Sequence, residues 1–310
     1  MSGLSEPSAV GAEEPPASGL PDPTAPLTAT GSLRRRAAVS RALEVTATGS
    51  ALLAVAVFCI VIYTVVSRGA GAISFSFLTT DPTGIGTGGI APAIVGSAVI
   101  VAIATAIAMP LGVLIALYLI EFAGRRSGRV VRMALDLTNG LPTVVVAIMV
   151  YGLIVVGSGD SAIAASIALA IVMLPLIARS SHQVLLLVPG TLREASDALG
   201  VSRWRGVLGV VLPSALGGIV TATILAAARA AGETVPILLL SSLVTSNDVQ
   251  INPLHAVSAM PLTIYTDFND GVPAAVTQAW GTELVLMAII LAANIGARMF
   301  LARNRSRLGL

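Results

Sequence analysis

The sequence predicts an all-α membrane protein with six transmembrane helices and both termini in the cytoplasm. Of its 310 residues, 55% are hydrophobic and 11% are charged, and the mean hydropathy is +0.90, whereas soluble domains carry about 25% charged residues. Long apolar runs can each hold the roughly 17 to 25 residues that a membrane-crossing helix needs. These runs cover residues 45–67, 82–120, 137–159, 161–178, 206–228 and 279–301.

The first 44 residues differ in composition from the rest of the chain. Six prolines lie between Pro7 and Pro26, mixed with Ala, Ser, Gly, Thr and acidic residues, and such a segment buries too little apolar surface to fold. We therefore expect a disordered cytoplasmic tail over 1–44 and one transmembrane domain over 45–310. The first apolar run is long enough to span, so we interpret it as a retained anchor and not as a signal peptide.

Arginine is distributed in a pattern that predicts orientation. All 18 basic residues are arginine, and 16 of them lie before span one, after span two, after span four or at the C-terminus. These are Arg34, Arg35, Arg36, Arg41, Arg125, Arg126, Arg129, Arg132, Arg179, Arg193, Arg203, Arg205, Arg298, Arg303, Arg305 and Arg307. The opposite connections carry Arg68 and aspartates, so the arginine-rich side and both termini are expected in the cytoplasm. The pI of about 9.1 then needs no nucleic-acid partner.

The longest cytoplasmic connection between spans covers residues 179–214 and predicts two short helices joined by a tight turn. Thr191 and Glu194 have the spacing of a capping box, so we expect the first helix to start there. Gly200 supplies the left-handed position that ends it. Ser202 can cap a second helix, which we expect to end before the next proline.

The chain cannot hydrolyse ATP with a P-loop. That motif needs a lysine to reach the outer phosphate oxygens, and the sequence contains no lysine. If ATP drives the protein, hydrolysis has to occur in a separate subunit, and the 179–214 connection is the largest internal platform for one. We therefore expect no enzymatic activity in this chain. His182 and His255 lack partners at metal-ligand spacing, so no metal and no cofactor is expected.

Two charged residues stand inside the fifth apolar region, which we extend over 215–240. Arg229 lies near its middle, with Glu233 four residues later; a central Arg is unfavourable by about 2.5 to 3.5 kcal/mol and normally faces a cavity or a partner. The i, i+4 spacing predicts an ion pair. The pair can fix helix packing, or Arg229 can offer its planar fork to a tetrahedral oxyanion, with Glu233 as counter-ion. These roles are compatible, and Thr234 completes the candidate substrate pathway.

Three other conspicuous residues have structural interpretations. Glu121 and Asp136 lie at the inner ends of spans two and three, where we expect each to pair with a nearby arginine. Cys59, the single cysteine, lies in the first run, where it acts as an apolar filler and cannot form an intramolecular disulfide.

Several stretches of the sequence resemble a known family. The 179–214 connection is similar to the loop by which ATP-binding-cassette (ABC) importer permeases dock on their ATPase, and the matching residues are Glu194, Ala195, Gly200, Leu212 and Pro213. Ser196 departs from the alanine of that pattern, a change of similar size. The stretches at 228–239 and 259–265 are similar to segments of PstA-type phosphate permeases, and the resemblance covers about residues 45–310.

The resemblance implies a type I ABC importer permease with the MetI-like fold, a multi-pass protein of the cell inner (plasma) membrane. Its expected partners are a PstC-like second permease, a PstB-like ATPase and a periplasmic or lipid-anchored phosphate-binding protein, besides membrane lipid. The long outer connections, 68–90 and 241–278, face the side where a delivery partner would dock. Two alternatives stay open at this point: the same machine for another oxyanion such as sulfate or molybdate, and an ATP-independent channel or secondary carrier.

Overall fold

The computed structural model describes residues 31–241 and 248–308, which fall into two units, 1–59 and 60–310. The described part of the first unit belongs to helix α1 (Gly31–Gly69). Residues 1–30 of the expected tail lie outside the described residues. Residues 31–44, which we expected to be disordered, are helical because Arg and Ala, good helix formers, replace the prolines there.

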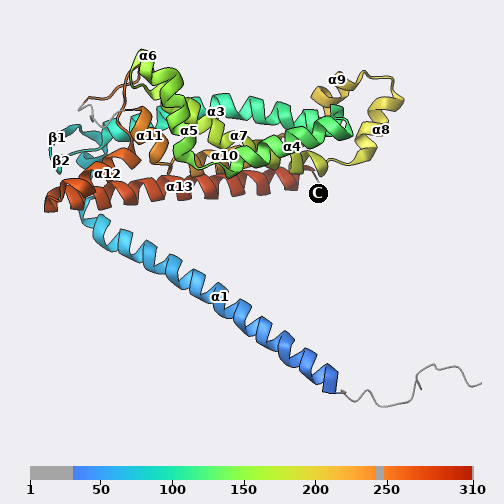
Figure 1. The fold of residues 1–310 in the computed structure, drawn as a ribbon, viewed down its shortest axis with the longest axis horizontal. Helices are drawn as coiled ribbons and strands as arrows, with labels where there is room; N and C mark the ends of the chain where they lie inside the picture. The colour runs from blue at the N-terminus through green and yellow to red at the C-terminus, as the bar shows by residue number, and fades with distance from the viewer. Residues whose placement is uncertain (1–30, 242–247, 309–310) are drawn as a thin grey trace, which may run out of the picture. The chain divides into compact units, whose positions relative to one another are not determined.

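The second unit is a helical bundle with one two-stranded hairpin (Figure 1). On the way to the first long helix lie η1 (Ala70–Ala72), α2 (Phe75–Thr79), β1 (Pro82–Gly84) and β2 (Thr87–Gly88). The bundle then contains α3 (Ala91–Leu117), η2 (Tyr118–Phe122), α4 (Arg125–Gly140), α5 (Thr143–Val150), η3 (Tyr151–Val155), α6 (Val156–Ser158) and α7 (Ala162–Leu186). It ends with α8 (Gly190–Ala198), α9 (Arg203–Gly206), η4 (Val207–Val211), α10 (Leu212–Ala230), α11 (Val235–Leu240), α12 (Met260–Asp270) and α13 (Pro273–Leu308).

Five helices in the described part of the chain are long and apolar enough to cross a membrane. They cover Arg35–Ala72, Ala91–Phe122, Ala162–Leu186, Arg203–Ala230 and Pro273–Ala302. A sixth span results if the bent pair of α4 and α5–α6 counts as one. The predicted all-α membrane class is therefore confirmed, whereas the orientation of the termini stays a prediction.

Two of the expected spans are interrupted. The third bends by 96° between α4 and α5, because Pro142 disfavours a helical conformation at Leu141, which is extended at φ −71° and ψ 134°. The fifth, expected as 215–240, stops at Ala230 and resumes as α11 at Val235. A third difference is at the second span: the uncharged run from 82 begins with the β1–β2 hairpin, so the helix starts at Ala91.

Small residues allow the central helices to pack closely. Helix α7 is rich in alanine, and Ala164, Ala165 and Ala168 are fully buried. A side chain at Gly112 of α3 would come within 2.8 Å of Ile177 of α7. Such contacts between small residues are typical of helix packing inside membranes, where backbones approach closely.

The two ends of the second unit carry different structures (Figure 1). The β1–β2 hairpin and α12 lie at one end, and α8 and α9 lie at the other. At the first end, the chain before α12 is held by hydrogen bonds: the Ser241 hydroxyl accepts from the Val257 amide (3.2 Å), and the Ser97 hydroxyl accepts from the Met260 amide (2.8 Å). This end is therefore tied to α3 and α11.

Candidate functional site

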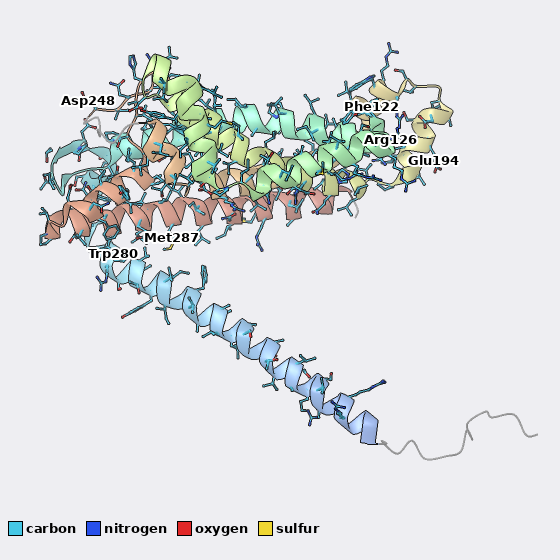
Figure 2. The ribbon with its side chains drawn as sticks, viewed as in Figure 1. Phe122, Arg126, Glu194, Asp248, Trp280 and Met287 are labelled. Carbon is cyan, nitrogen blue, oxygen red and sulfur yellow. The ribbon has the colours of Figure 1, made fainter. Side chains whose placement is uncertain are left out.

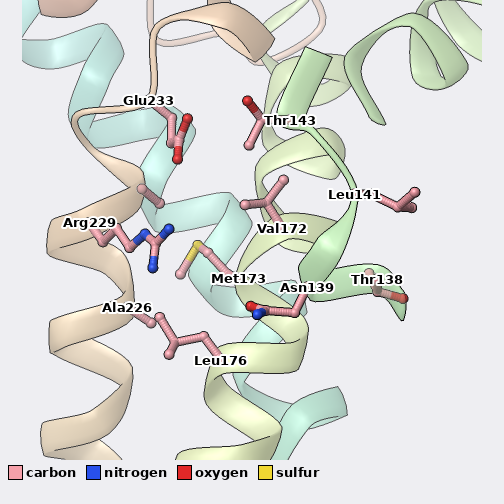
Figure 3. Close-up of a pocket in the computed structure, with 11 residues that line it drawn as sticks. Thr138, Asn139, Leu141, Thr143, Val172, Met173, Leu176, Ala226, Arg229 and Glu233 are labelled. Atoms are coloured by element: carbon pink, nitrogen blue, oxygen red, sulfur yellow. The ribbon is translucent and has the colours of Figure 1, made fainter. Parts of the chain in front are cut away.

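A cavity of about 90 Å³ opens where the two interrupted spans meet (Figure 3). Residues from α4, α5, α7, α10 and the turn after α10 line it: Thr138, Asn139, Leu141, Thr143, Val172, Met173, Leu176, Ala226, Arg229, Ala230 and Glu233. The volume is sufficient for more than one water molecule. Backbone that leaves the helical conformation at membrane depth is tolerated where it lines a cavity that water can fill.

Arg229 lies in the last turn of α10, and not near the middle of a span as expected. Its side chain is exposed, and the negative end of the helix dipole favours a cation at this position. Glu233 follows the helix in a turn in which its amide donates to the Ala230 carbonyl (3.0 Å). Because α10 ends between them, the i, i+4 geometry does not apply, and no ion pair links the two side chains within the described residues.

The opposite wall of the cavity is formed by the break between α4 and α5. Asn139 comes from the last turn of α4, and Thr143 is the first residue of α5. Figure 3 shows the guanidinium of Arg229, the carboxylate of Glu233 and the amide of Asn139 pointing into the same space. Helix α5 begins without a side-chain cap, and its positive end lies at the cavity, since Thr143 belongs to the lining. The Val145 amide donates to the Pro142 carbonyl (3.0 Å), so the amides of Thr143 and Val144 are the ones that precede the first helical hydrogen bond.

This arrangement suits a small oxyanion. The guanidinium, the Asn139 amide and the amino end of α5 can donate hydrogen bonds to anionic oxygens. Glu233 can accept a hydrogen bond from an anion that carries a proton, and it repels a fully ionised one. Thr234 does not belong to the lining; it precedes α11, is half-buried and makes no side-chain cap.

Three polar lining residues, Thr138, Asn139 and Thr143, were missed from the sequence. Asn139 and Thr143 flank Gly140-Leu141-Pro142, and a Gly followed by a Pro inside an apolar run is a signal for a chain break. That signal was available, but the length of the run favoured a continuous span.

The 179–214 connection forms an elbow, residues 190–206, from α8 and α9. Gly200 is at φ +67°, which confirms the predicted left-handed turn. The capping box is wrong, because α8 begins at Gly190 after Pro189 and no side chain caps it. The second helix was also expected to end before Pro213, but α9 continues through η4 into α10. Pro213 is accommodated inside this helical span because the π-helical turn η4 ends just before it, and a local π adjustment of this kind re-satisfies backbone groups that a proline frees.

Of the five residues expected to face an ATPase, three lie in the elbow and two lie beyond it, at the start of α10. Glu194, Ala195 and Gly200 are exposed, Pro213 is exposed and Leu212 is half-buried. Figure 2 shows Glu194 at the same end of the second unit as Phe122 and Arg126. The elbow therefore offers a free face at the arginine-rich end.

The predicted pairing of two carboxylates with arginines is confirmed. Asp136 pairs with Arg179. Glu121 lies 3.1 Å from Arg193 and 3.9 Å from Arg203, measured between carboxylate oxygen and Nε. Both arginines next to Glu121 belong to the elbow.

Comparisons with known proteins identify the family of the chain. The family model of the binding-protein-dependent transport system inner membrane component matches residues 108–306. The phosphate transport system permease protein PstA 1 of Mycobacterium tuberculosis is 37% identical over 228 residues, which cover 72% of this chain and 73% of the relative. PstA of Mycobacterium leprae is 35% identical over 250 residues, covering 78% and 82% respectively.

A solved structure supports the fold. An inward-facing form of the MetNI methionine ABC transporter is similar with a TM-score of 0.56 and 19% sequence identity, over 69% of this chain and 94% of the matched chain. At this identity the likeness concerns the fold alone, which is that of ABC importer permeases.

Proposed function

Since the chain belongs to the family of binding-protein-dependent transport system inner membrane components, with PstA-type phosphate permeases as its relatives, we propose that it carries inorganic phosphate into the cytoplasm as the permease subunit of an ABC importer. The chain is a multi-pass membrane subunit and not the ATPase, whose hydrolysis takes place in a separate protein.

The cavity beside Arg229 is the observation that supports phosphate as the substrate. An exposed arginine at the end of a membrane span requires water, an ion or a partner protein next to it. A planar guanidinium facing the amino end of α5 matches a tetrahedral anion from two sides. Because Arg229 is exposed in this chain alone, a second permease subunit would complete the wall of the pathway.

Glu233 keeps the binding of the anion weak enough for its release, as transport requires. A site along a conduction path has to bind strongly enough for entry and weakly enough for release. The carboxylate lines the same cavity as the guanidinium without pairing with it in the described structure, and its negative charge opposes the attraction of the guanidinium for the anion. It also accepts a hydrogen bond from the proton that phosphate keeps near neutral pH, whereas sulfate carries no such proton. The carboxylate therefore favours phosphate over sulfate.

The two ends of the second unit suit different partners in this proposal. A PstB-like ATPase docks on the outer face of the elbow, which includes Glu194 and Gly200. A PstC-like permease covers the Arg229 side, and a phosphate-binding protein delivers its cargo at the end that carries β1–β2 and α12. In this arrangement the arginine-rich end, with both termini, lies in the cytoplasm.

The test is ATP-dependent uptake by the chain reconstituted into vesicles with its co-purifying partners. Arg229→Gln is expected to lower the initial rate of radioactive phosphate uptake by about tenfold or more, because it removes a charge-assisted fork worth over 1.4 kcal/mol. Arg298→Gln, at an exposed position of α13, is the matched control and is expected to keep the wild-type rate.

Three results would contradict the proposal. Undiminished uptake by Arg229→Gln would remove the residue from the pathway. Sulfate entering as fast as phosphate would assign the subunit to another oxyanion. Phosphate flux in vesicles that lack the ATPase would indicate a channel or a secondary carrier.

A further inference from the structure

Five side chains join the elbow to the inner end of α3. We call them the inner latch: Glu121 and Phe122 from η2, Arg193 from α8, and Arg203 and Trp204 from α9. We propose that Glu121 is a positioning residue that fixes the elbow to α3, so that a displacement of the elbow by the ATPase moves the transmembrane bundle. This inference rests on the proposed function, in which the elbow carries the ATPase.

The centre of the latch is a buried carboxylate. The Glu121 side chain is 8% exposed, and the Arg193 side chain, 3.1 Å away, is 29% exposed. Removing one member of a buried ion pair leaves an uncompensated charge, which is strongly unfavourable. The contact therefore resists separation of α8 from η2.

Arg193 links three elements. Its Nε approaches Glu121, but the N–H is not aligned for a hydrogen bond. Its Nη2 donates to the Leu185 carbonyl in the last turn of α7 (3.1 Å). One guanidinium of α8 is thus held by η2 on one side and by α7 on the other.

The second arm of the elbow is attached to the next residue of η2. The rings of Phe122 and Trp204 stack with centroids 4.5 Å apart and planes inclined by 26°. The guanidinium carbon of Arg203 lies 5.4 Å from the centroid of the Phe122 ring, and its Nε lies 3.9 Å from the Glu121 carboxylate. Two successive residues of η2 therefore hold both α8 and α9.

The two helices of the elbow are also tied to each other. Ser196 of α8 is buried against α9, where a side chain at Gly206 would come within 2.6 Å of the Ser196 hydroxyl. The Val201 amide donates to the Ser196 carbonyl across the turn (3.2 Å). A force on the exposed Glu194 face therefore reaches the latch and is not absorbed between α8 and α9.

The other side of the latch continues into the bundle. Residues Ala91–Phe122 form one uninterrupted helical span, in which η2 is a π-helical turn at the end of α3. Helix α3 packs tightly on α7 at Gly112 and Ile177. Rigid packed elements of this kind carry energetic coupling between distant sites. Displacement at Glu121 is thus passed along α3 to the outer half of the protein.

The experiment uses the full importer in vesicles and measures phosphate uptake and ATP hydrolysis together. Glu121→Gln is expected to lower the phosphate taken up per ATP by about fivefold to tenfold, while the ATPase still co-purifies in wild-type amount. Glu121→Asp keeps the charge and is expected to retain more of this ratio. Asp136→Asn removes a member of the Asp136–Arg179 ion pair, which lies outside the latch. The Asp136 side chain is 64% exposed and the Arg179 side chain is 42% exposed, so this variant is expected to leave the ratio unchanged.

A second measurement does not depend on the substrate. Amide hydrogen exchange of residues 190–206 in the assembled complex is expected to be faster in Glu121→Gln than in the wild type, because the elbow is released from η2. If the wild-type complex hydrolyses ATP but imports no phosphate, the proposed function fails, and the exchange difference still tests the latch.

Two outcomes would overturn the inference. The first is an unchanged ratio together with unchanged exchange in Glu121→Gln. The second is a loss of uptake that only follows a loss of bound ATPase, since this would make Glu121 a residue of assembly alone. If Glu121→Gln does not reach the membrane, the inference is tested with Trp204→Leu instead. Trp204 is 55% exposed, so the chain is expected to fold without its ring. Loss of the ring stack with Phe122 is expected to lower the phosphate taken up per ATP about threefold.

Discussion

A guanidinium at the carboxyl end of a helix interacts favourably with the last carbonyl groups, and Arg229 holds this position in α10. Because the side chain is exposed, water or an ion can reach it. Glu233 stands beyond the end of the helix, in the same cavity, without pairing with Arg229 in the described part of the chain. The two charges therefore act on an entering anion with opposite signs, and neither is neutralised beforehand.

Asp267 of α12, outside the membrane spans, should make the stability of the protein depend on pH. Burial, reinforced by the neighbouring Asp270, raises the pKa of Asp267 to about 6 from an ordinary value of 3.8. The folded state thus binds the proton more tightly than the unfolded state, so this contribution to stability is present below about pH 4 and is lost as the pH rises through 6. One carboxylate oxygen is buried without a hydrogen-bond partner among the described residues.

The measurement is thermal unfolding of the solubilised protein between pH 4.5 and 7.5, compared with Asp267→Asn. The variant cannot ionise, so its Tm should exceed that of the wild type by roughly 2–4 °C at pH 7.5, with a smaller gap at pH 4.5. Asp270→Asn, at an exposed position, serves as the control. It removes only the smaller cause of the raised pKa, so at pH 7.5 its Tm should lie only slightly closer than the wild-type Tm to that of Asp267→Asn. A gap that does not change with pH would contradict the assignment.

Among the glycines of the described residues, Gly96 of α3 leaves the least room for a side chain. A side chain there would come within 1.9 Å of the Ser258 carbonyl oxygen, in the segment that leads into α12. Since the obstacle is backbone, Gly96→Ala should force the two segments apart and destabilise the protein by about 1–3 kcal/mol. The effect is measured as a lower midpoint of thermal unfolding in detergent.

Gly157→Ala is the matched control for this substitution. Gly157 is also helical, in α6, but a side chain there meets nothing within 4 Å. Its midpoint should equal that of the wild type or lie slightly above it, because alanine is the better helix former. Equal losses in both variants would show that the contact between α3 and residue 258 is unimportant.

The elements themselves could be predicted to different degrees. The spans could be predicted from the apolar runs, because a helix that crosses the lipid requires about 20 predominantly apolar residues. The runs could not indicate the breaks at Leu141–Pro142 and after Ala230, because hydropathy reports how apolar a segment is and not its direction. The left-handed Gly200 was predictable from a local backbone requirement, whereas the Thr191–Glu194 box failed because α8 starts one residue before Thr191. The cavity wall from α4 and α5 depends on tertiary packing.

Across the second unit as a whole, the elbow and the outer hairpin lie at opposite ends, and α3 and α7 run between them (Figure 1). Asn139 and Arg229 meet between these ends, at the breaks of two separate spans. In the proposed transport function, events at the elbow have to change the cavity without direct contact. Elements such as α3, which connect both ends, are therefore expected to carry the change.

The shape of the elbow can be tested at Gly200. Its φ of +67° is unfavourable for a side chain, although nothing lies within 4 Å of the position where one would stand. Gly200→Val therefore tests backbone conformation without a steric clash: adopting the left-handed region is unfavourable by about 1–3 kcal/mol for a branched residue. The strain is expected to change the angle between α8 and α9 and to lower the amount of co-purified ATPase by at least about fivefold.

Gly190→Ala is the matched control. Gly190 lies at the start of α8, and a side chain there also meets nothing within 4 Å, so this variant should co-purify the ATPase in wild-type amount. Wild-type recovery of the ATPase by Gly200→Val, at equal amounts of the chain in the membrane, would mean that the ATPase does not depend on the bent form of the elbow.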